Sequence, residues 1–205
     1  MPDSVPPSGR AVRRPRADAL RNRERVLAVA RDAFATDGPS ISLDEIARRA
    51  GLGAGTVHRH FPTKQELLAA VIAERLAGLA EDARRRAEAR DAGQAFFDFF
   101  RQLVDSARDH LALTAAFTTA DDVADSVRDA GGHLAEALRV LLERAQRLGA
   151  VRTDVGIGEL HAIIAGTLVM EQRLPTPAAR GRGVAVVLDG LRPQPDANRA
   201  RHADH

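Results

Sequence analysis

Residues 42–64 read SLDEIARRAGLGAGTVHRHFPTK, and this stretch decides the fold of the N-terminal part of the chain. Ser42, followed by Glu45 three residues later, fits a capping box, which begins a helix. Apolar residues then recur at helical spacing, so residues 42–50 are predicted to form a short amphipathic helix. Gly51 stands where a helix-ending glycine belongs, because that turn favours a positive φ.

A second short helix is predicted over residues 54–60. Pro62 ends it, because the residue before a proline is disfavoured in the α region. Thr63 and Glu66 repeat the capping pattern and begin a much longer helix. Two short helices joined by a glycine turn make a helix-turn-helix, whose second helix enters the major groove of DNA.

A family resemblance covers roughly residues 20–70 and rests on an ordered set of residues. In chain order these are Val26, Leu27, Ala30, Phe34, Gly38, Ile46, Ala47, Gly51, Gly55, Thr56, His58, Arg59, His60, Phe61 and Lys64. In this combination the chain resembles the DNA-binding domain of TetR-type transcriptional regulators. The resemblance implies a homodimer that binds a double-stranded DNA operator and a small-molecule effector. We expect no cofactor, and no metal site at His58 and His60, because residues i and i+2 face different sides of a helix.

DNA contacts are expected from the second short helix and its flanks. The expected set is Ser42, Ala54, Gly55, Thr56, His58, Arg59, His60 and Lys64. Thr56 can offer its methyl group or its hydroxyl to a base edge or a phosphate, and Arg59 can read guanine or bind a phosphate instead. Lys64 opens the next helix, where an ammonium group and free backbone N–H groups suit a phosphate.

Two residues depart from the family pattern. Gly53 stands where the family usually has Ser or Thr, so the cap of the second short helix is weaker. His58 stands where the family usually has Tyr, and its side chain reaches less far. A second interpretation therefore stays open, namely a helical ligand-binding or protein-interaction module whose helix-turn-helix no longer binds DNA specifically.

Composition narrows the function classes. The 205 residues contain no cysteine, which excludes disulfides and thiolate metal sites and fits the cytoplasm, and no run is apolar enough to span a membrane. No spacing typical of an enzyme active site occurs, so we expect no enzymatic activity. Residues 1–65 hold 12 Lys and Arg against 7 Asp and Glu, whereas residues 66–205 hold 18 against 21. A basic head on a mildly acidic body is typical of a DNA-binding domain joined to a second domain.

The predicted fold is all-α, with an N-terminal three-helix helix-turn-helix domain joined to a C-terminal antiparallel helical bundle. The expected domains are a disordered basic arm (1–17), a DNA-binding domain (18–65), an effector-binding and dimerisation domain (66–192) and a disordered tail (193–205). The first helix is expected over residues 18–37. Helices of the bundle are expected at 93–109, 111–118, 133–149, 156–173 and 177–191, and it stays open whether 122–130 joins the third of these.

Phenylalanines cluster early in the bundle, and two interpretations of them stay open. The first is an ordinary packed core. The second is an apolar effector pocket with a few polar groups. The pocket residues would be Phe96, Phe97, Phe100, Leu103, Phe117, Leu138 and His161.

The last two helices are predicted to form the dimer interface, with packing inside one subunit as the alternative. Small residues line one face of the first of these helices, and an apolar stripe follows the second. The residues are Gly158, Ala162, Ala165, Gly166 and Val169, then Val184, Val187, Leu188 and Leu191.

Overall fold

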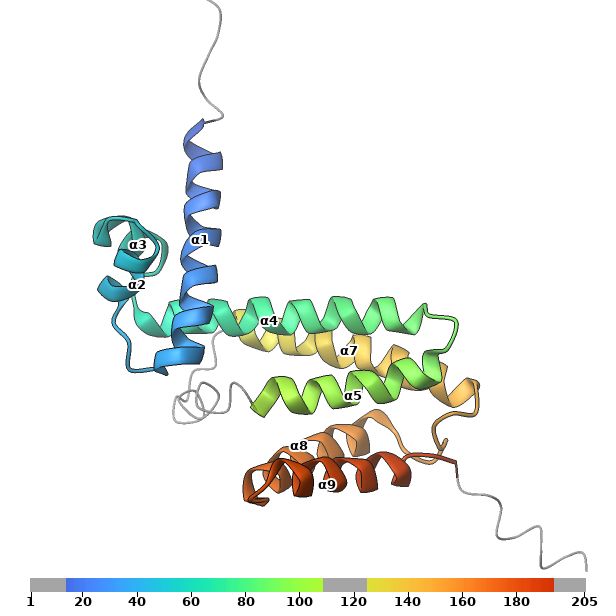
Figure 1. Ribbon diagram of the computed structural model, residues 1–205. Coiled ribbons are helices and arrows are strands. Elements are labelled where there is room, and N and C mark those ends of the chain that lie inside the picture. The colour runs from blue at the N-terminus through green and yellow to red at the C-terminus, as the bar shows by residue number, and fades with distance from the viewer. Residues whose placement is uncertain (1–13, 109–124, 194–205) are drawn as a thin grey trace, which may run out of the picture. The chain divides into compact units, whose positions relative to one another are not determined.

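The computed structural model describes residues 14–108 and 125–193, and all regular structure in these ranges is helical (Figure 1). The chain divides into two compact units, residues 1–68 and 69–205. The described helices are α1 (Arg14–Asp37), α2 (Leu43–Arg49), α3 (Ala54–His60), α4 (Lys64–Ala87), α5 (Ala92–Arg108), α7 (Asp125–Arg147), α8 (Ile157–Arg173) and α9 (Pro177–Gly190). The all-α fold class is therefore confirmed.

Two helices are longer than the sequence indicated. α1 begins at Arg14 rather than Asp18, so residues 14–17 of the predicted arm are helical. Pro15 is compatible with this start, because the first turn of a helix needs no N–H donor from it. α7 runs without a break from Asp125 through Gly131 and Gly132, so residues 125–130 do join the helix predicted at 133–149. The predicted helix at 111–118, and with it Phe117, lies outside the described residues.

The first unit is a small three-helix domain around one apolar centre. α1 contributes Val26, Ala30 and Phe34, each at most 2% exposed. Ile46 of α2 and Val57 of α3 are fully buried against them. Gly38, with a φ of 75°, ends α1 and lets the chain turn towards α2. Because α3 places a single buried residue in this centre, most of its surface is left for other contacts.

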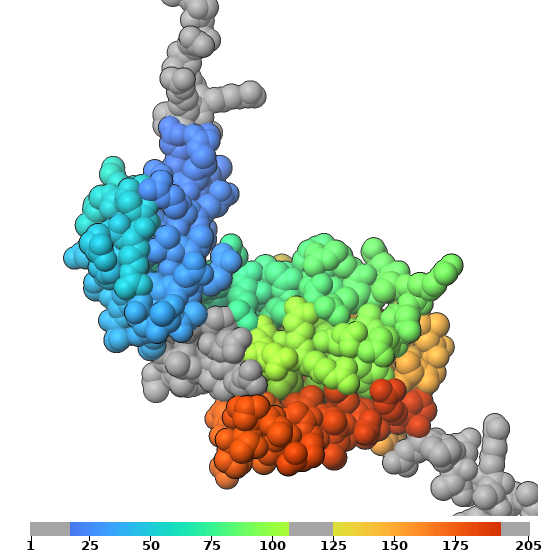
Figure 2. All heavy atoms as spheres, in the orientation of Figure 1, coloured from blue at the N-terminus to red at the C-terminus, as the bar shows by residue number. Residues whose placement is uncertain are grey.

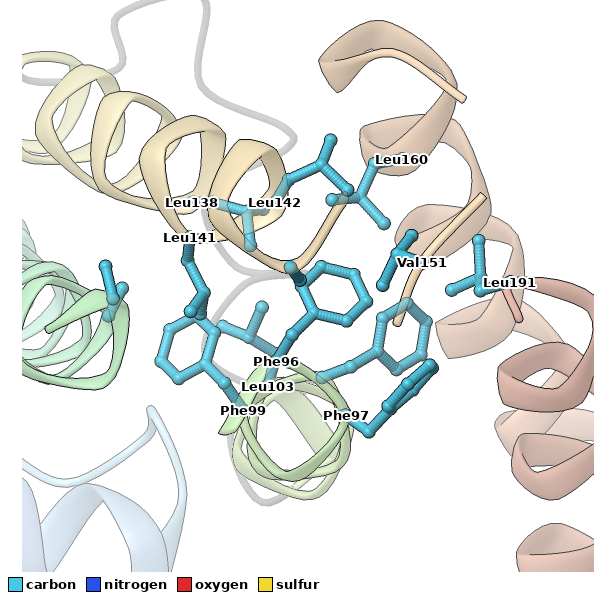
Figure 3. Packing of buried hydrophobic residues seen from close by; sticks show 14 of the residues in the cluster. Phe96, Phe97, Phe99, Leu103, Leu138, Leu141, Leu142, Val151, Leu160 and Leu191 are labelled. Carbon is cyan, nitrogen blue, oxygen red and sulfur yellow. The ribbon is translucent and has the colours of Figure 1, made fainter. Parts of the chain in front are cut away.

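The second unit is built around the phenylalanines of α5 (Figure 3). Phe96 and Phe97 meet edge to face, with ring centroids 5.4 Å apart. Figure 3 shows Phe96 and Phe99 directed towards leucines of α7, and Phe97 on the side of Val151 and Leu191. α4 closes another side through small residues, and α8 and α9 complete the core. No helix of the described ranges is long and apolar enough to cross a membrane.

Arginines of α4 connect that helix to α5. The Arg86 side chain donates to Gln102 at 2.7 Å and to Asp82 at 2.8 Å, and its guanidinium lies 5.7 Å from the centre of the Phe99 ring. Arg86 thereby holds α4 against α5. α4 begins in the first unit and continues into the second as a single helix.

Candidate nucleic-acid interface

The turn between α2 and α3 has the geometry that the sequence predicts. The N–H of Leu52 donates to the carbonyl of Ala47 at 3.0 Å, and the N–H of Gly51 donates to that of Arg48 at 3.1 Å. This pair of bonds is a Schellman motif, and Gly51 has the positive φ of 62° that the motif requires. Only residues 50–53 separate the two helices, so the turn sets the direction in which α3 leaves α2.

Ser42 caps α2 as predicted, but Glu45 does not complete the capping box in the described bonds. The Ser42 hydroxyl accepts from the N–H of Glu45 at 3.2 Å. The Glu45 carboxylate accepts instead from Arg48 at 2.7 Å and from Arg49 at 2.8 Å. These charged hydrogen bonds, that from Arg48 first, lower the pKa of Glu45 to about 2. Arg48 and Arg49, three and four residues after Glu45, bind the carboxylate in place of the Ser42 backbone N–H that a capping box would use.

α3 presents the side chains that a DNA-reading helix needs. Ala54, Gly55, His58 and Arg59 are exposed, and Val57 alone is buried. The Arg59 guanidinium folds back on its own helix, where Nε donates to the carbonyl of Gly55 at 3.0 Å. A side chain held this way must swing outward to reach a base edge. Gly53 precedes α3 without any side-chain cap bond, as the sequence indicated.

α1 contributes a second wall beside α3. A hollow of about 350 Å³ is lined by Asp18, Ala19 and Asn22 of α1 and by Thr56, Arg59 and His60 of α3. The Asn22 amide and three side chains of α3 therefore face one space. Sequence reasoning missed Asp18 and Asn22, because nothing in a linear pattern reports which face of α1 lies beside α3.

His58 and Lys64 occupy the two flanks of this surface. The Nε2 atom of His58 lies 3.5 Å from the Asp44 carboxylate of α2, a pair that is ionic only when the histidine is protonated. Lys64 is half-buried in the first turn of α4, where the Thr63 hydroxyl accepts from the N–H of Glu66 at 3.1 Å. The eight residues expected to contact DNA thus lie in one small unit, on α3 and on the adjoining starts of α2 and α4.

The residues expected to line an effector pocket pack with one another in the second unit. Phe96, Phe97 and Phe100 are at most 2% exposed and share a core with Leu103 and Leu138. His161 is exposed on α8. A cavity of about 250 Å³ opens between α5, α8 and α9, and Val104 belongs both to its lining and to the core. Its wall carries charge of both signs, from Arg101, Asp105, Glu171 and Arg180.

α8 and α9 lie side by side (Figure 2). The two helices differ in which of their residues are exposed. All five small or apolar residues predicted for the α8 face are exposed: Gly158, Ala162, Ala165, Gly166 and Val169. The apolar stripe predicted on α9 faces inward. Leu188 and Leu191 are at most 2% exposed and belong to the core of their own chain. Among the large apolar residues of α9, Val186 is the exposed one, at 72%.

Comparison with known families gives matches to both units. Residues 26–71 match the family described as bacterial regulatory proteins, tetR family. Residues 91–193 match the family described as the C-terminal domain of SbtR-like transcriptional regulators. A TetR transcription regulatory protein from Mycobacterium vanbaalenii is 41% identical in sequence, with a TM-score of 0.69. That alignment covers 87% of this chain and 99% of the other.

Curated relatives share a shorter stretch. The regulator TtgW of Pseudomonas putida, itself uncharacterised, is 42% identical over 64 residues, which is 31% of this chain and 48% of TtgW. The chain therefore spans about half the length of that relative. The Thermus thermophilus protein FadR, a TetR family repressor solved with lauroyl-CoA, is 21% identical with a TM-score of 0.54. The alignment covers 85% of this chain and 97% of the FadR chain. At 21% identity the likeness shows the fold alone.

Proposed function

Because the chain belongs to the TetR family of DNA-binding transcriptional regulators, we propose that it is a homodimeric repressor released from its operator by a small molecule. The observation that carries this proposal is α3, a short helix with exposed polar side chains behind a Schellman turn. The family consists of regulators rather than enzymes, so the prediction of no enzymatic activity agrees with it.

Operator reading is assigned to α3. Gly55 and Ala54 are exposed and small, so the backbone can approach the DNA closely. Arg59 reads a guanine after leaving the Gly55 carbonyl, and Thr56 contacts a neighbouring base or phosphate. Lys64, His58, His60 and Ser42 bind the phosphates on either side and fix the register of the helix. The alternative, a module without specific DNA binding, predicts that substitution of these residues changes no sequence preference.

Dimerisation is assigned to the exposed small-residue face of α8, together with Val186 of α9. Around Gly158 and Gly166, the position of a Cβ atom has no neighbouring atom within 4 Å in the protomer. Such glycines permit close approach of a second helix, and a two-fold axis makes the same face available on both subunits. A dimer then carries two copies of α3 to successive major grooves of a near-palindromic operator.

Effector binding is assigned to the second unit, where α5 joins the Phe-rich core to the charged cavity. The packing of Phe96, Phe97 and Phe100 leaves two routes for a ligand, either opening of the core with Leu103 and Leu138 or entry from the cavity beside Val104. FadR supports the general idea, because that repressor was solved in complex with lauroyl-CoA. A ligand releases DNA only if it binds the non-binding state more tightly.

The test is selection of the purified chain against random duplex DNA, followed by salt-dependent binding to the selected sequence. We expect a palindromic sequence with half-sites about one helical turn apart, or slightly more. Weak binding without sequence enrichment would contradict the proposal. Sedimentation of the complex gives the number of chains per operator, and two chains are expected.

A further inference from the structure

Arg25 of α1 reaches across to the turn that precedes the recognition helix. Its Nε atom donates to the carbonyl of Ala50 at 2.6 Å, and its Nη2 atom donates to the carbonyl of Gly51 at 3.1 Å. Both acceptors belong to the main chain at the end of α2. A guanidinium presents several N–H groups in one rigid plane, and here two of its nitrogens bind two successive carbonyls.

Neither carbonyl accepts one of the turn's own backbone hydrogen bonds. The Schellman bonds run from the amides of Gly51 and Leu52 back to Arg48 and Ala47, and the Ala50 amide donates to Ile46 at 2.8 Å. The end of a helix leaves carbonyls without an intrahelical partner and carries partial negative charge. A positively charged donor from α1 therefore completes the bonding of the turn and complements its charge.

Gly51 and Arg25 also fit each other sterically. A Cβ atom placed on Gly51 would lie 2.7 Å from Nη2 of Arg25, closer than a Cβ atom comes to a non-bonded neighbour. The glycine thus serves two purposes, the positive φ of 62° and the space for the guanidinium. With any larger residue at position 51, either the backbone of the turn or the Arg25 side chain would have to move.

α3 is a short helix that buries little of its own surface. It has seven residues, one buried side chain and no side-chain cap at Gly53. Helices this short are marginal in isolation, so tertiary contacts at their ends decide their direction. The turn, residues 50–53, leads directly into α3, and Arg25 connects it to α1, the longest helix of the unit.

We propose that Arg25 is a positioning residue for operator recognition, which fixes the α2–α3 turn and thereby the direction of α3. This inference rests on the proposed function, since it assigns Arg25 a part in the same DNA reading. Arg25 touches no base in this account. Its contribution passes through the carbonyls of Ala50 and Gly51, and removing it lowers discrimination between sequences more than it lowers attraction to DNA.

The test compares Arg25→Gln with the wild type for binding to the selected operator and to random DNA, across salt concentrations and well below the melting temperature. We expect operator affinity to fall about tenfold, the scale of losing charged hydrogen bonds. Random-DNA affinity and the salt slope should stay unchanged. Arg31→Gln, which removes an exposed arginine six residues further along α1, is the matched control and should bind as the wild type.

Two other results would overturn the inference. If Arg25 were a phosphate ligand, both affinities would fall and the salt slope would flatten by about 0.9. If it only stabilised the fold, Arg25→Gln would bind normally once folded. Arg25→Lys keeps the positive charge but lacks the planar guanidinium that binds two carbonyls at once, so it should lose part of the operator affinity and little stability. Wild-type binding by this variant would also contradict the proposed role of the two hydrogen bonds.

Hydrogen exchange separates this inference from the proposed function. The amides of residues 54–61 should exchange about tenfold faster in Arg25→Gln than in Arg31→Gln, because opening of the turn becomes easier. Amides of α5 should not change. A wild type that selects no operator would defeat the proposed function, while exchange would still decide whether Arg25 holds α3. Unchanged exchange in α3 would overturn the positioning role.

Discussion

The two units of this chain use their residues in opposite ways. The first unit places eight polar or small residues on or beside a seven-residue helix and buries one residue of that helix. The second unit places four phenylalanines on α5 and buries all of them to 2% or less. The structure of the first unit depends on helix caps, a tight turn and hydrogen-bond donors at fixed positions. The structure of the second unit depends on how well its side chains fill the core. The comparison teaches that a role can be proposed for each single residue in the first unit, whereas in the second unit the residues act together as a packed core.

The largest expected effect tests whether the Phe cluster is a core. Phe96→Ala should lower the free energy of unfolding by about 3–5 kcal/mol, because it removes a fully buried ring and leaves a cavity. Urea unfolding measures this, with Leu148→Ala as control, since Leu148 is 55% exposed and its loss should matter little. A stable Phe96→Ala protein that no longer responds to its effector would make the cluster a pocket instead.

The next effect tests whether the exposed α8 face joins two chains. Gly166→Leu should leave the protomer folded, because a Cβ atom at Gly166 meets nothing within 4 Å, but should block helix approach across the interface. Analytical ultracentrifugation should show monomers. Operator affinity should fall about 100-fold or more, because two linked heads bind far better than one. Gly132→Leu, at an exposed glycine of α7 with equally open space, should remain dimeric.

A smaller effect separates base reading from phosphate binding within the first unit. Arg59→Ala should cost about 1–3 kcal/mol in operator binding and relax preference at one base position. Lys64→Ala should weaken binding to all sequences alike and flatten the salt slope by about 0.9. Binding measured against a panel of operators, each with one altered base pair, tells the two patterns apart. Uniform weakening by Arg59→Ala would assign that side chain to a phosphate.

The smallest effect concerns acid stability. The pKa of Glu45 lies at about 2, below its ordinary 4.5, because Arg48 and Arg49 stabilise the carboxylate in the folded state. Its stabilising contribution is complete above pH 4.5 and is lost as the pH falls through 2. Thermal melts of wild type and Glu45→Gln should therefore differ near neutral pH and converge across that window. A difference that persists at pH 2 would argue against these ion pairs.

Sequence reasoning succeeded where structure is local. The sequence predicts the second short helix at about residues 54–60, and α3 spans Ala54–His60, because Gly51 and Pro62 act on their own neighbours. The continuity of α7 through Gly131 and Gly132 was left open, since glycine disfavours a helix but tertiary packing can outweigh that cost of about 1 kcal/mol per residue.

Contacts between distant segments could not be predicted from the sequence. The α9 stripe has helical periodicity whether it faces a partner or its own core, and the structure buries Leu188 and Leu191 internally. Asn22 and Arg25 lie on a helix with many arginines, and only folding shows that Asn22 borders α3 and Arg25 meets the turn. Periodicity indicates that a face is apolar, but it does not name the surface that covers it.

The scarcity of lysine has a practical consequence for Lys64. The chain has 30 basic residues, yet Lys64 carries its only ε-amino group, half-buried in the first turn of α4. Amine-selective reagents distinguish lysine from arginine, so under conditions that spare the chain terminus they would modify one side chain, four residues after the end of α3. A fluorophore placed there would report on the head without any engineered cysteine. Slower acylation in the presence of duplex DNA would then measure occupancy of the binding surface directly.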